Sequence, residues 1–238
     1  MPNAFVEKMC SLADLSNEDV YLLQSASNII RSVPARQDLI REGDKPGPIF
    51  TILEGWACCY KLLPEGGRQI TAFLLPGDCS DMHFAMIDAM DHSICTLSRC
   101  RVAYITRASM GALSESHSSI NHAFRMTAQT DDSVLRAWFV CVGRRTAIER
   151  VAHLMCELYL RARLVAKSDQ CQMPLTQIVL ADALGLTPVH VNRVLRVLRA
   201  SGMMKLGNGT LVISDFARLS TIAGFSENYL HRRVKQAA

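Results

Sequence analysis

The stretch from Leu175 to Ile213 constrains the fold more than any other part of the chain. Two segments with apolar residues at helical spacing meet at Gly185, and Thr187-Pro188 opens the second segment. A threonine N-cap followed by proline in the first turn is a strong helix start. Gly207-Asn208-Gly209 then separates two short β-type runs, which is typical of a tight hairpin. Helix, turn, helix and hairpin in this order predict a winged helix-turn-helix.

The second of these helices, over residues 187–199, has two chemically different faces. One is an apolar stripe, expected to pack inward, that consists of Val191, Val194, Leu195 and Leu198. The other carries arginine, which can donate two hydrogen bonds to guanine O6 and N7 when a helix enters the major groove of DNA. Arg196, Arg199 and Lys205 are better placed for phosphates. The full set assigned to DNA is Thr176, Gln177, Thr187, Val189, His190, Asn192, Arg193, Arg196, Arg199 and Lys205.

The positive charge of the chain is concentrated around this stretch. The net charge is +4 overall, but residues 143–238 hold 14 Lys and Arg against 6 Asp and Glu, whereas residues 1–142 hold 12 against 16. A basic C-terminal part beside an acidic body favours a polyanionic partner for the basic part.

From about Asp38 to Thr106 the sequence is typical of short strands separated by turns. The run IFTILEGWACCYKLL ends at Pro64-Glu65-Gly66-Gly67, and RQITAFLLPGD follows. Many short strands with Gly and Pro breaks predict a small β-sandwich or barrel. We expect roughly the first 35 residues to be helical, with Ser16 and Asn17 available as N-caps.

Around Ser109 the spacing of the apolar residues changes to that of a long helix. Positions alternately four and three residues apart, as in a heptad repeat, are Ile120, Phe124, Thr127, Asp131, Val134, Trp138 and Cys141. Such a helix either packs on its own domain or pairs with its copy in a second chain. Because the run lies between two parts of opposite charge, we favour pairing, with the first six residues in a dimer interface.

The C-terminal segments outside the winged helix-turn-helix are simpler. TAIERVAHLMCELYLRARL predicts an amphipathic helix, VAKSDQCQMP a polar loop, and DFARLSTIAGF a final helix capped by Ser214 or Asp215. The chain is thus expected to divide into residues 1–109, 110–143 and 144–238.

Several classes of protein lack support in the sequence. No run reaches the roughly 18 apolar residues that span a bilayer, and the N-terminus MPNAFVEKMCSLADLS lacks a secretory signal pattern. We therefore expect a cytoplasmic protein with no membrane partner. The enzyme motifs G-x-x-x-x-G-K-[ST], H-E-x-x-H and G-x-S-x-G are absent, and no catalytic role is expected.

The cysteines follow no metal-binding or disulfide pattern. There are nine, with no C-x-x-C pair, and we expect most of them to be small buried residues. Cys58-Cys59, which are adjacent, and Cys95 with Cys100 leave room for a redox role.

The sequence resembles the Crp/Fnr family of bacterial transcription regulators over nearly its whole length. LTQIVLADALGLTPVHVNRVLRVLRASGMM looks like the DNA-binding signature of that family, and LIREGD, IFTILEGWACCYK and LLPGD look like its cyclic-nucleotide-binding β-roll. The resemblance implies an α+β fold with an N-terminal double-stranded β-helix (jelly-roll) domain, a long dimerisation helix and a C-terminal winged helix-turn-helix. It also implies a homodimer.

The β-roll departs from the cyclic-nucleotide pattern of the family. Asp81-Met82 stands where cyclic-AMP-binding members have Gly-Glu, and His92-Ser93 where they have the Arg-Ser pair that holds the phosphate. A neutral His near an Asp binds phosphate poorly compared with Arg. Cyclic AMP is therefore not expected, although these four positions remain the candidate effector pocket. Cys10 lacks the neighbouring cysteines that a 4Fe-4S cluster needs; no cofactor is predicted, and haem remains an open alternative.

The helix assigned to DNA reading departs from the family as well. Many members have Glu where this chain has Val189, which His190, Asn192 and Arg193 follow. Glu accepts a hydrogen bond from cytosine N4, whereas Val offers only apolar contact, for example to a thymine methyl group. We therefore expect Arg193 to keep a guanine contact while the adjoining specificity differs.

These observations predict a homodimeric transcription regulator that binds a palindromic site in double-stranded DNA and acts with RNA polymerase. A small-molecule effector of unknown identity, or a redox signal, would modulate it at the β-roll. The alternative is a ligand- or redox-sensing module whose winged helix contacts protein instead of DNA. Steep salt dependence distinguishes DNA binding from protein contact.

Overall fold

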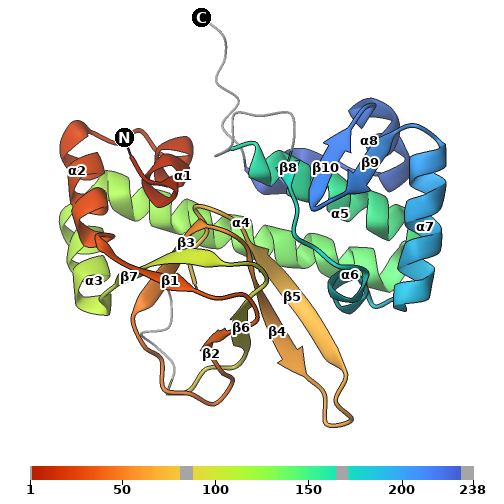
Figure 1. Ribbon diagram of the computed structural model, residues 1–238. Helices are drawn as coiled ribbons and strands as arrows, with labels where there is room; N and C mark the ends of the chain where they lie inside the picture. Colours follow the sequence, from red (N-terminus) through yellow and green to blue (C-terminus); the bar gives the residue numbers. More distant parts are fainter. Residues whose placement is uncertain (1, 81–87, 165–170, 232–238) are drawn as a thin grey trace, which may run out of the picture. The chain divides into compact units, whose positions relative to one another are not determined.

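The computed structural model describes residues 2–80, 88–164 and 171–231. The described residues form two compact units. The first unit comprises those of 1–59, 73–134 and 228–238, and the second those of 60–72 and 135–227. Each unit is described by itself below, with element labels as in Figure 1.

The first unit begins with two short capped helices. In α1 (Ala4–Leu12) the side chain of Asn3 accepts a hydrogen bond from the Val6 backbone. In α2 (Asn17–Ala26) Ser16 and Asp19 form a reciprocal capping box, as the sequence predicted for Ser16. The helical part of the N-terminal region ends at Ala26, earlier than expected, because residues from Ile29 onward form a strand that pairs with residues 100–104.

Two antiparallel sheets form the body of the first unit (Figure 1). One has the strand order β1-β7-β3, with bounds Ile29–Val33, Cys100–Ile105 and Ile49–Glu54. The other has the order β2-β6-β4-β5, with bounds Asp38–Ile40, Ser93–Thr96, Ala57–Leu62 and Arg68–Leu74. Apolar side chains of both sheets meet in one buried cluster that includes Phe50, Ile52, Leu74, Ile94 and Val102. The predicted small β-sandwich is confirmed.

Two helices replace the single long helix expected over residues 110–143. They are α3 (Arg107–Ser116) and α4 (Ser118–Arg144), and His117 at the break is the C-cap of α3. The 27 residues of α4 contribute to both units, with the division after Val134.

Most of the residues that the heptad spacing of α4 assigned to a dimer interface are buried within the single chain. Five of the six are buried within the single chain: Ile120, Phe124, Thr127, Val134 and Trp138. Ile120 and Phe124 pack in a cluster with side chains of α1, and Trp138 donates its indole N–H to Glu157, with Nε1–Oε distances of 3.0 and 3.1 Å. Asp131 is exposed. A helix that packs on its own chain has the same apolar spacing as one that pairs with a copy, and here the spacing reports intrachain packing.

A different stripe of α4 remains accessible. It also alternates by three and four residues, through Asn121, Arg125, Ala128, Asp132, Leu135, Phe139 and Val142, none of which is buried. Its C-terminal part is apolar, with Phe139 81% and Leu135 53% exposed. We refer to these seven residues as the outer stripe.

The second unit has the predicted winged helix-turn-helix. After α5 (Ala147–Ala162) come α6 (Gln177–Leu184), α7 (Pro188–Ala200), the hairpin of β9 (Met204–Gly207) and β10 (Thr210–Ile213), and α8 (Phe216–Ala223) with Asp215 as its N-cap. A short 3-10 helix, η2 (Glu227–Leu230), follows. Strand β8 (Cys171–Gln172), which pairs with β10, lies inside the segment for which the sequence predicts a polar loop. Its two residues are too few to show a strand pattern.

The tip of the β4–β5 hairpin also belongs to the second unit. Arg68 forms an ion pair with Asp182 of α6, with an Nη2–Oδ2 distance of 2.7 Å, and the side chain of Gln69 donates to the Ala183 carbonyl at 3.2 Å. The turn at the tip is closed by hydrogen bonds between Leu63 and residues 66 and 67, as the Pro64-Glu65-Gly66-Gly67 signal predicted.

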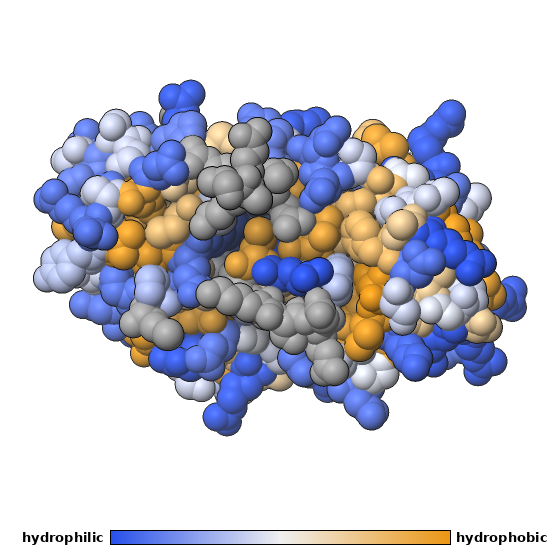
Figure 2. Space-filling model, turned by 90° about the horizontal axis from the view of Figure 1, so that it is seen from above, coloured by the Kyte–Doolittle hydropathy of each residue, from blue (hydrophilic) through white to orange (hydrophobic). Residues whose placement is uncertain are grey.

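No single helix among the described residues is long and apolar enough to cross a membrane. The bent pair formed by α6 and α7 passes the same test of length and composition when the two helices are taken together. On the face of the molecule seen in Figure 2, hydrophilic side chains interrupt the hydrophobic areas.

Candidate nucleic-acid interface

The two ends of α6 are fixed by residues that the sequence singled out. Thr176 caps α6 by accepting a hydrogen bond from the Val179 backbone at 3.2 Å. Gly185 ends α6 with its backbone in the left-handed conformation at φ +62°, which residues other than glycine rarely adopt. The two helix axes are then bent by 102°, within the range of helix-turn-helix motifs.

A cap at its start and a buried stripe hold α7 in place. Thr187 accepts a hydrogen bond from the His190 backbone at 3.2 Å, and Pro188 follows as the first helical residue. The buried residues of α7 are Val191, Val194, Leu195 and Leu198, the stripe that the sequence predicted. This stripe anchors α7 to the unit and leaves its opposite face exposed.

The exposed face of α7 borders a shallow hollow. Its lining consists of Gln177 from α6 with Pro188, Val189, Asn192, Arg193 and Arg196 from α7. Its volume is about 390 Å³, and Val189 on its rim is 72% exposed. We call this the reading face, because apolar, amide and guanidinium side chains border a single hollow there.

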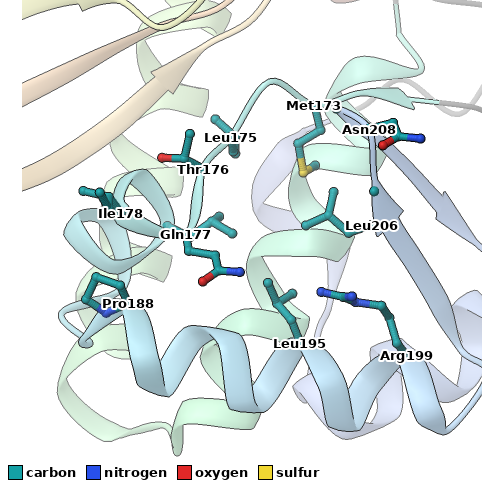
Figure 3. Close-up of a pocket in the computed structure, with 13 residues that line it drawn as sticks. Met173, Leu175, Thr176, Gln177, Ile178, Pro188, Leu195, Arg199, Leu206 and Asn208 are labelled. Carbon is teal, nitrogen blue, oxygen red and sulfur yellow. The ribbon is translucent and has the colours of Figure 1, made fainter.

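A second hollow lies between α6, α7 and the β9–β10 hairpin, with a volume of about 490 Å³. Figure 3 shows Gln177 from α6 and Arg199 from α7 directed into it, with Leu206 and Asn208 of the hairpin on its far side. Pro188 and Asn208 also line these hollows, although neither is among the residues that the sequence assigns to DNA. The Thr-Pro helix start and the Gly-Asn-Gly turn predict a cap and a hairpin, and neither pattern by itself indicates a surface that binds a ligand.

The predicted site residues divide into those that line the reading face, those that line the second hollow and those that line neither. Gln177, Val189, Asn192, Arg193 and Arg196 line the reading face, and Thr176, Gln177 and Arg199 line the second hollow. Thr187, His190 and Lys205 are exposed but line neither hollow.

The cations of this surface are available to an external anion. Arg193, Arg196, Arg199 and Lys205 are exposed. Across the part of the chain that the structure describes, the ion pairs lie elsewhere and include none of these four. Four cations without internal partners create a positive potential that attracts a polyanion.

The candidate effector pocket does not suit a cyclic phosphate. The His92 ring lies 2.7 Å from the Asp91 carboxylate (Nδ1–Oδ1), so a negative charge already occupies its surroundings. The Ser93 hydroxyl accepts a hydrogen bond from the Glu42 backbone at 2.9 Å. Asp81 and Met82 lie outside the described residues. The residues that are described therefore do not fit the phosphate of a cyclic nucleotide.

Family models match both parts of the chain. The model of the Crp-like helix-turn-helix domain matches residues 149–222, and that of the cyclic nucleotide-binding domain matches residues 30–117. The first match includes the caps, the turn and the reading face described above.

Curated relatives and solved structures agree with these models. The nitrogen fixation regulation protein FixK of Bradyrhizobium diazoefficiens is 31% identical over 190 residues, which cover 79% of this chain and 78% of the relative. The transcriptional activator protein FnrL of Cereibacter sphaeroides is 30% identical, with 82% and 80% covered. The structure of FixK2 from Bradyrhizobium japonicum shares the fold with a TM-score of 0.74 at 23% identity, covering 83% of this chain and 98% of that one. The chain therefore belongs to the Crp/Fnr family of transcription regulators.

Proposed function

We propose that this protein is a homodimeric, sequence-specific DNA-binding transcription regulator without enzymatic activity, acting in the cytoplasm together with RNA polymerase. The observation that carries the proposal is the reading face. It combines base-reading side chains with cations that have no internal partner, on a helix whose opposite face is buried.

Within this proposal, the side chains of the reading face divide the recognition of DNA between them. Arg193 donates to guanine O6 and N7, Asn192 pairs with an adenine edge, and Val189 contacts a thymine methyl group. Arg196 and Arg199 bind phosphates on either side and set the register of α7 in the major groove.

We assign dimerisation to the outer stripe of α4. Leu135 and Phe139 are large apolar side chains in contact with water, and a second copy of the same stripe would bury them. Two copies of α7 about 34–36 Å apart would then meet successive major grooves on one side of DNA, which requires a palindromic site.

Selection of bound DNA from a random pool tests the proposal. We expect a palindromic site with a guanine in each half-site and a base beside it that differs from the ordinary family consensus. Val189→Glu should shift that neighbouring base towards cytosine, whereas Lys205→Ala, the matched control, should leave the selected sequence unchanged. Recovery of the ordinary consensus by the unmodified protein would refute the role of Val189.

Salt dependence separates DNA binding from the protein-contact alternative. If α7 and its surroundings neutralise phosphates, the logarithm of the association constant should fall steeply and linearly with the logarithm of salt concentration. A complex held by protein contacts would show a much weaker dependence, and no sequence would be enriched from the pool.

For the β-roll, we propose regulation without cyclic AMP and without a 4Fe-4S cluster. The pairing of His92 with Asp91 supports the first part, and the single cysteine near the N-terminus, Cys10, supports the second. Mass spectrometry of the intact protein under native conditions would detect any small effector or haem that it retains.

A further inference from the structure

Two cysteines far apart in the sequence meet inside the β-roll. Cys58 lies on β4 and Cys95 on β6, which are neighbours in the four-stranded sheet, and their Sγ atoms are 3.6 Å apart. Both residues belong to the first unit, and both are thiols. At 3.6 Å the two sulfur atoms are in van der Waals contact.

The backbone geometry suits a covalent bond between these sulfurs. Neighbouring strands lie about 4.8 Å apart, and a disulfide joins Cα atoms roughly 4.4–6.8 Å apart. Closure therefore requires side-chain rotation that brings the sulfurs to about 2.05 Å, with little displacement of either strand.

An oxidant reaches Cys95 more easily than Cys58. Cys95 is 7% exposed, and Cys58 is 0% exposed. The strand that pairs with Cys95 is the edge strand β2, which has only three residues and a shift of register between Asp38 and Ile40. Short, irregular edge strands open more readily than central ones, because few hydrogen bonds hold them.

Four other buried cysteines lie outside the pair. Burial raises the pKa of Cys156 and of Cys79 to about 12, and that of Cys141 and Cys171 to about 11. These thiols stay protonated at neutral pH and react slowly, because the thiolate is the nucleophile. They provide controls for thiols that are buried but lie outside the pair.

We propose that Cys58 and Cys95 form an oxidation site of the β-roll that closes to a disulfide in the presence of hydrogen peroxide. The Cys95 sulfur attacks one peroxide oxygen, the O–O bond breaks, and a sulfenic acid and one water form. The Cys58 sulfur then attacks Cys95, the S–O bond breaks, and a second water leaves. The two thiols lose two electrons and two protons, and the peroxide is reduced to water.

The bond would link two strands of one sheet across the segment 59–94. It would tie β4, which continues into the hairpin tip at residues 60–67, covalently to β6. This proposal concerns the β-roll alone and does not depend on whether the reading face binds DNA.

The test uses the full-length protein, reduced, freed of reductant and exposed to hydrogen peroxide. Alkylation of the remaining thiols is followed by proteolysis without reductant and mass spectrometry. A Cys10→Ser, Cys59→Ser background removes the exposed thiol and the neighbour of Cys58. We expect a linked peptide pair containing Cys58 and Cys95 that is two hydrogens lighter than the separate peptides, and a loss of two titratable thiols per chain.

Variants distinguish this pair from general oxidation. Cys58→Ala should abolish the linked peptide, whereas Cys156→Ala should leave it unchanged. The unsubstituted protein gives the decisive result even if a variant folds poorly. A disulfide between other cysteines, overoxidised Cys95 without a link, or an unchanged thiol count in the unsubstituted protein would each overturn the proposal.

Discussion

Helices α7 and α4 each have a buried face and an exposed face, but the sequence distinguished the two faces only in α7. The buried residues of α7 are aliphatic and its outward residues include arginine, so a single assignment was possible. Helix α4 has two stripes with heptad-like spacing, and both contain large apolar residues. Chemical contrast between the faces of a helix, rather than periodicity alone, therefore identifies the outward surface.

The strongest effect on dimerisation and DNA binding should come from a substitution in the outer stripe of α4. Phe139→Asp replaces an 81% exposed ring with a charge, so folding of the single chain should change little. Burial of one Phe in each copy is worth roughly 3–6 kcal/mol per dimer, and we expect dissociation to weaken DNA binding at least a hundredfold. Sedimentation equilibrium measures the dissociation constant of the dimer. Gln129→Asp, which adds the same charge outside the stripe, should remain dimeric; monomers in this control would argue against the outer stripe as the interface.

The adjacent residue on α4 should behave in the opposite way. Trp138 is buried, and its indole N–H donates to the buried Glu157 carboxylate. Trp138→Ala should therefore lower the free energy of unfolding by about 3–5 kcal/mol, measured by urea denaturation at a protein concentration where the dimer is dissociated. Phe139→Ala serves as control and should cost far less. Equal losses at the two positions would contradict the assignment of the faces.

The burial of the heptad positions of α4 depends on residues outside the helix. Ile120 and Phe124 are buried because α1 packs on them, and Trp138 is buried beside Glu157 of α5. Helix α1 lies far from α4 in the sequence, and Glu157 is 19 residues from Trp138. By contrast, Thr176, Gly185 and Thr187 act on their own neighbours, so their caps and turn were predictable from local sequence alone. The strand pairings of the roll and the Cys58–Cys95 contact were likewise beyond reach, because both depend on register between distant segments.

On α7, Arg193 and Arg199 should differ in the kind of loss that their removal causes. Arg193 lines the reading face, whereas Arg199 lines the second hollow beside the hairpin. Arg193→Ala should cost about 1–3 kcal/mol on the selected site and relax its specificity. Arg199→Ala should weaken selected and random DNA alike and reduce the salt slope by about one. Fluorescence anisotropy measures the affinity of each variant for the selected and the random DNA. Equal losses in the two variants on both DNAs would contradict the assignment of base reading to Arg193 and phosphate binding to Arg199.

The free energy of unfolding should depend on pH through His153 of α5, the helix that packs against α7. His153 is 2% exposed, and burial, together with the charge of Arg145, lowers its pKa from 6.5 to about 4. The unfolded chain therefore binds a proton at higher pH than the folded chain, so stability is complete above pH 6.5 and falls from there towards pH 4. The loss should approach about 1.4 kcal/mol per pH unit within this window. His153→Leu should flatten that part of the urea-denaturation profile, and an unaltered slope would exclude His153 as its source.

The smallest effect concerns the start of α7, where the sequence signal was strongest. The Thr187 hydroxyl accepts a hydrogen bond from the His190 backbone, and removal of such a cap typically costs about 1 kcal/mol. Thr187→Ala should therefore lower the stability of the protein by about that amount, and Thr187→Ser, which keeps the oxygen, should restore most of it. Hydrogen exchange at residues 189–191 should rise in the alanine variant alone. If the serine variant exchanged as fast as the alanine variant, the methyl group of Thr187 rather than its hydroxyl would stabilise the first turn of α7. The Thr-Pro pattern would then predict the start of this helix without a side-chain hydrogen bond.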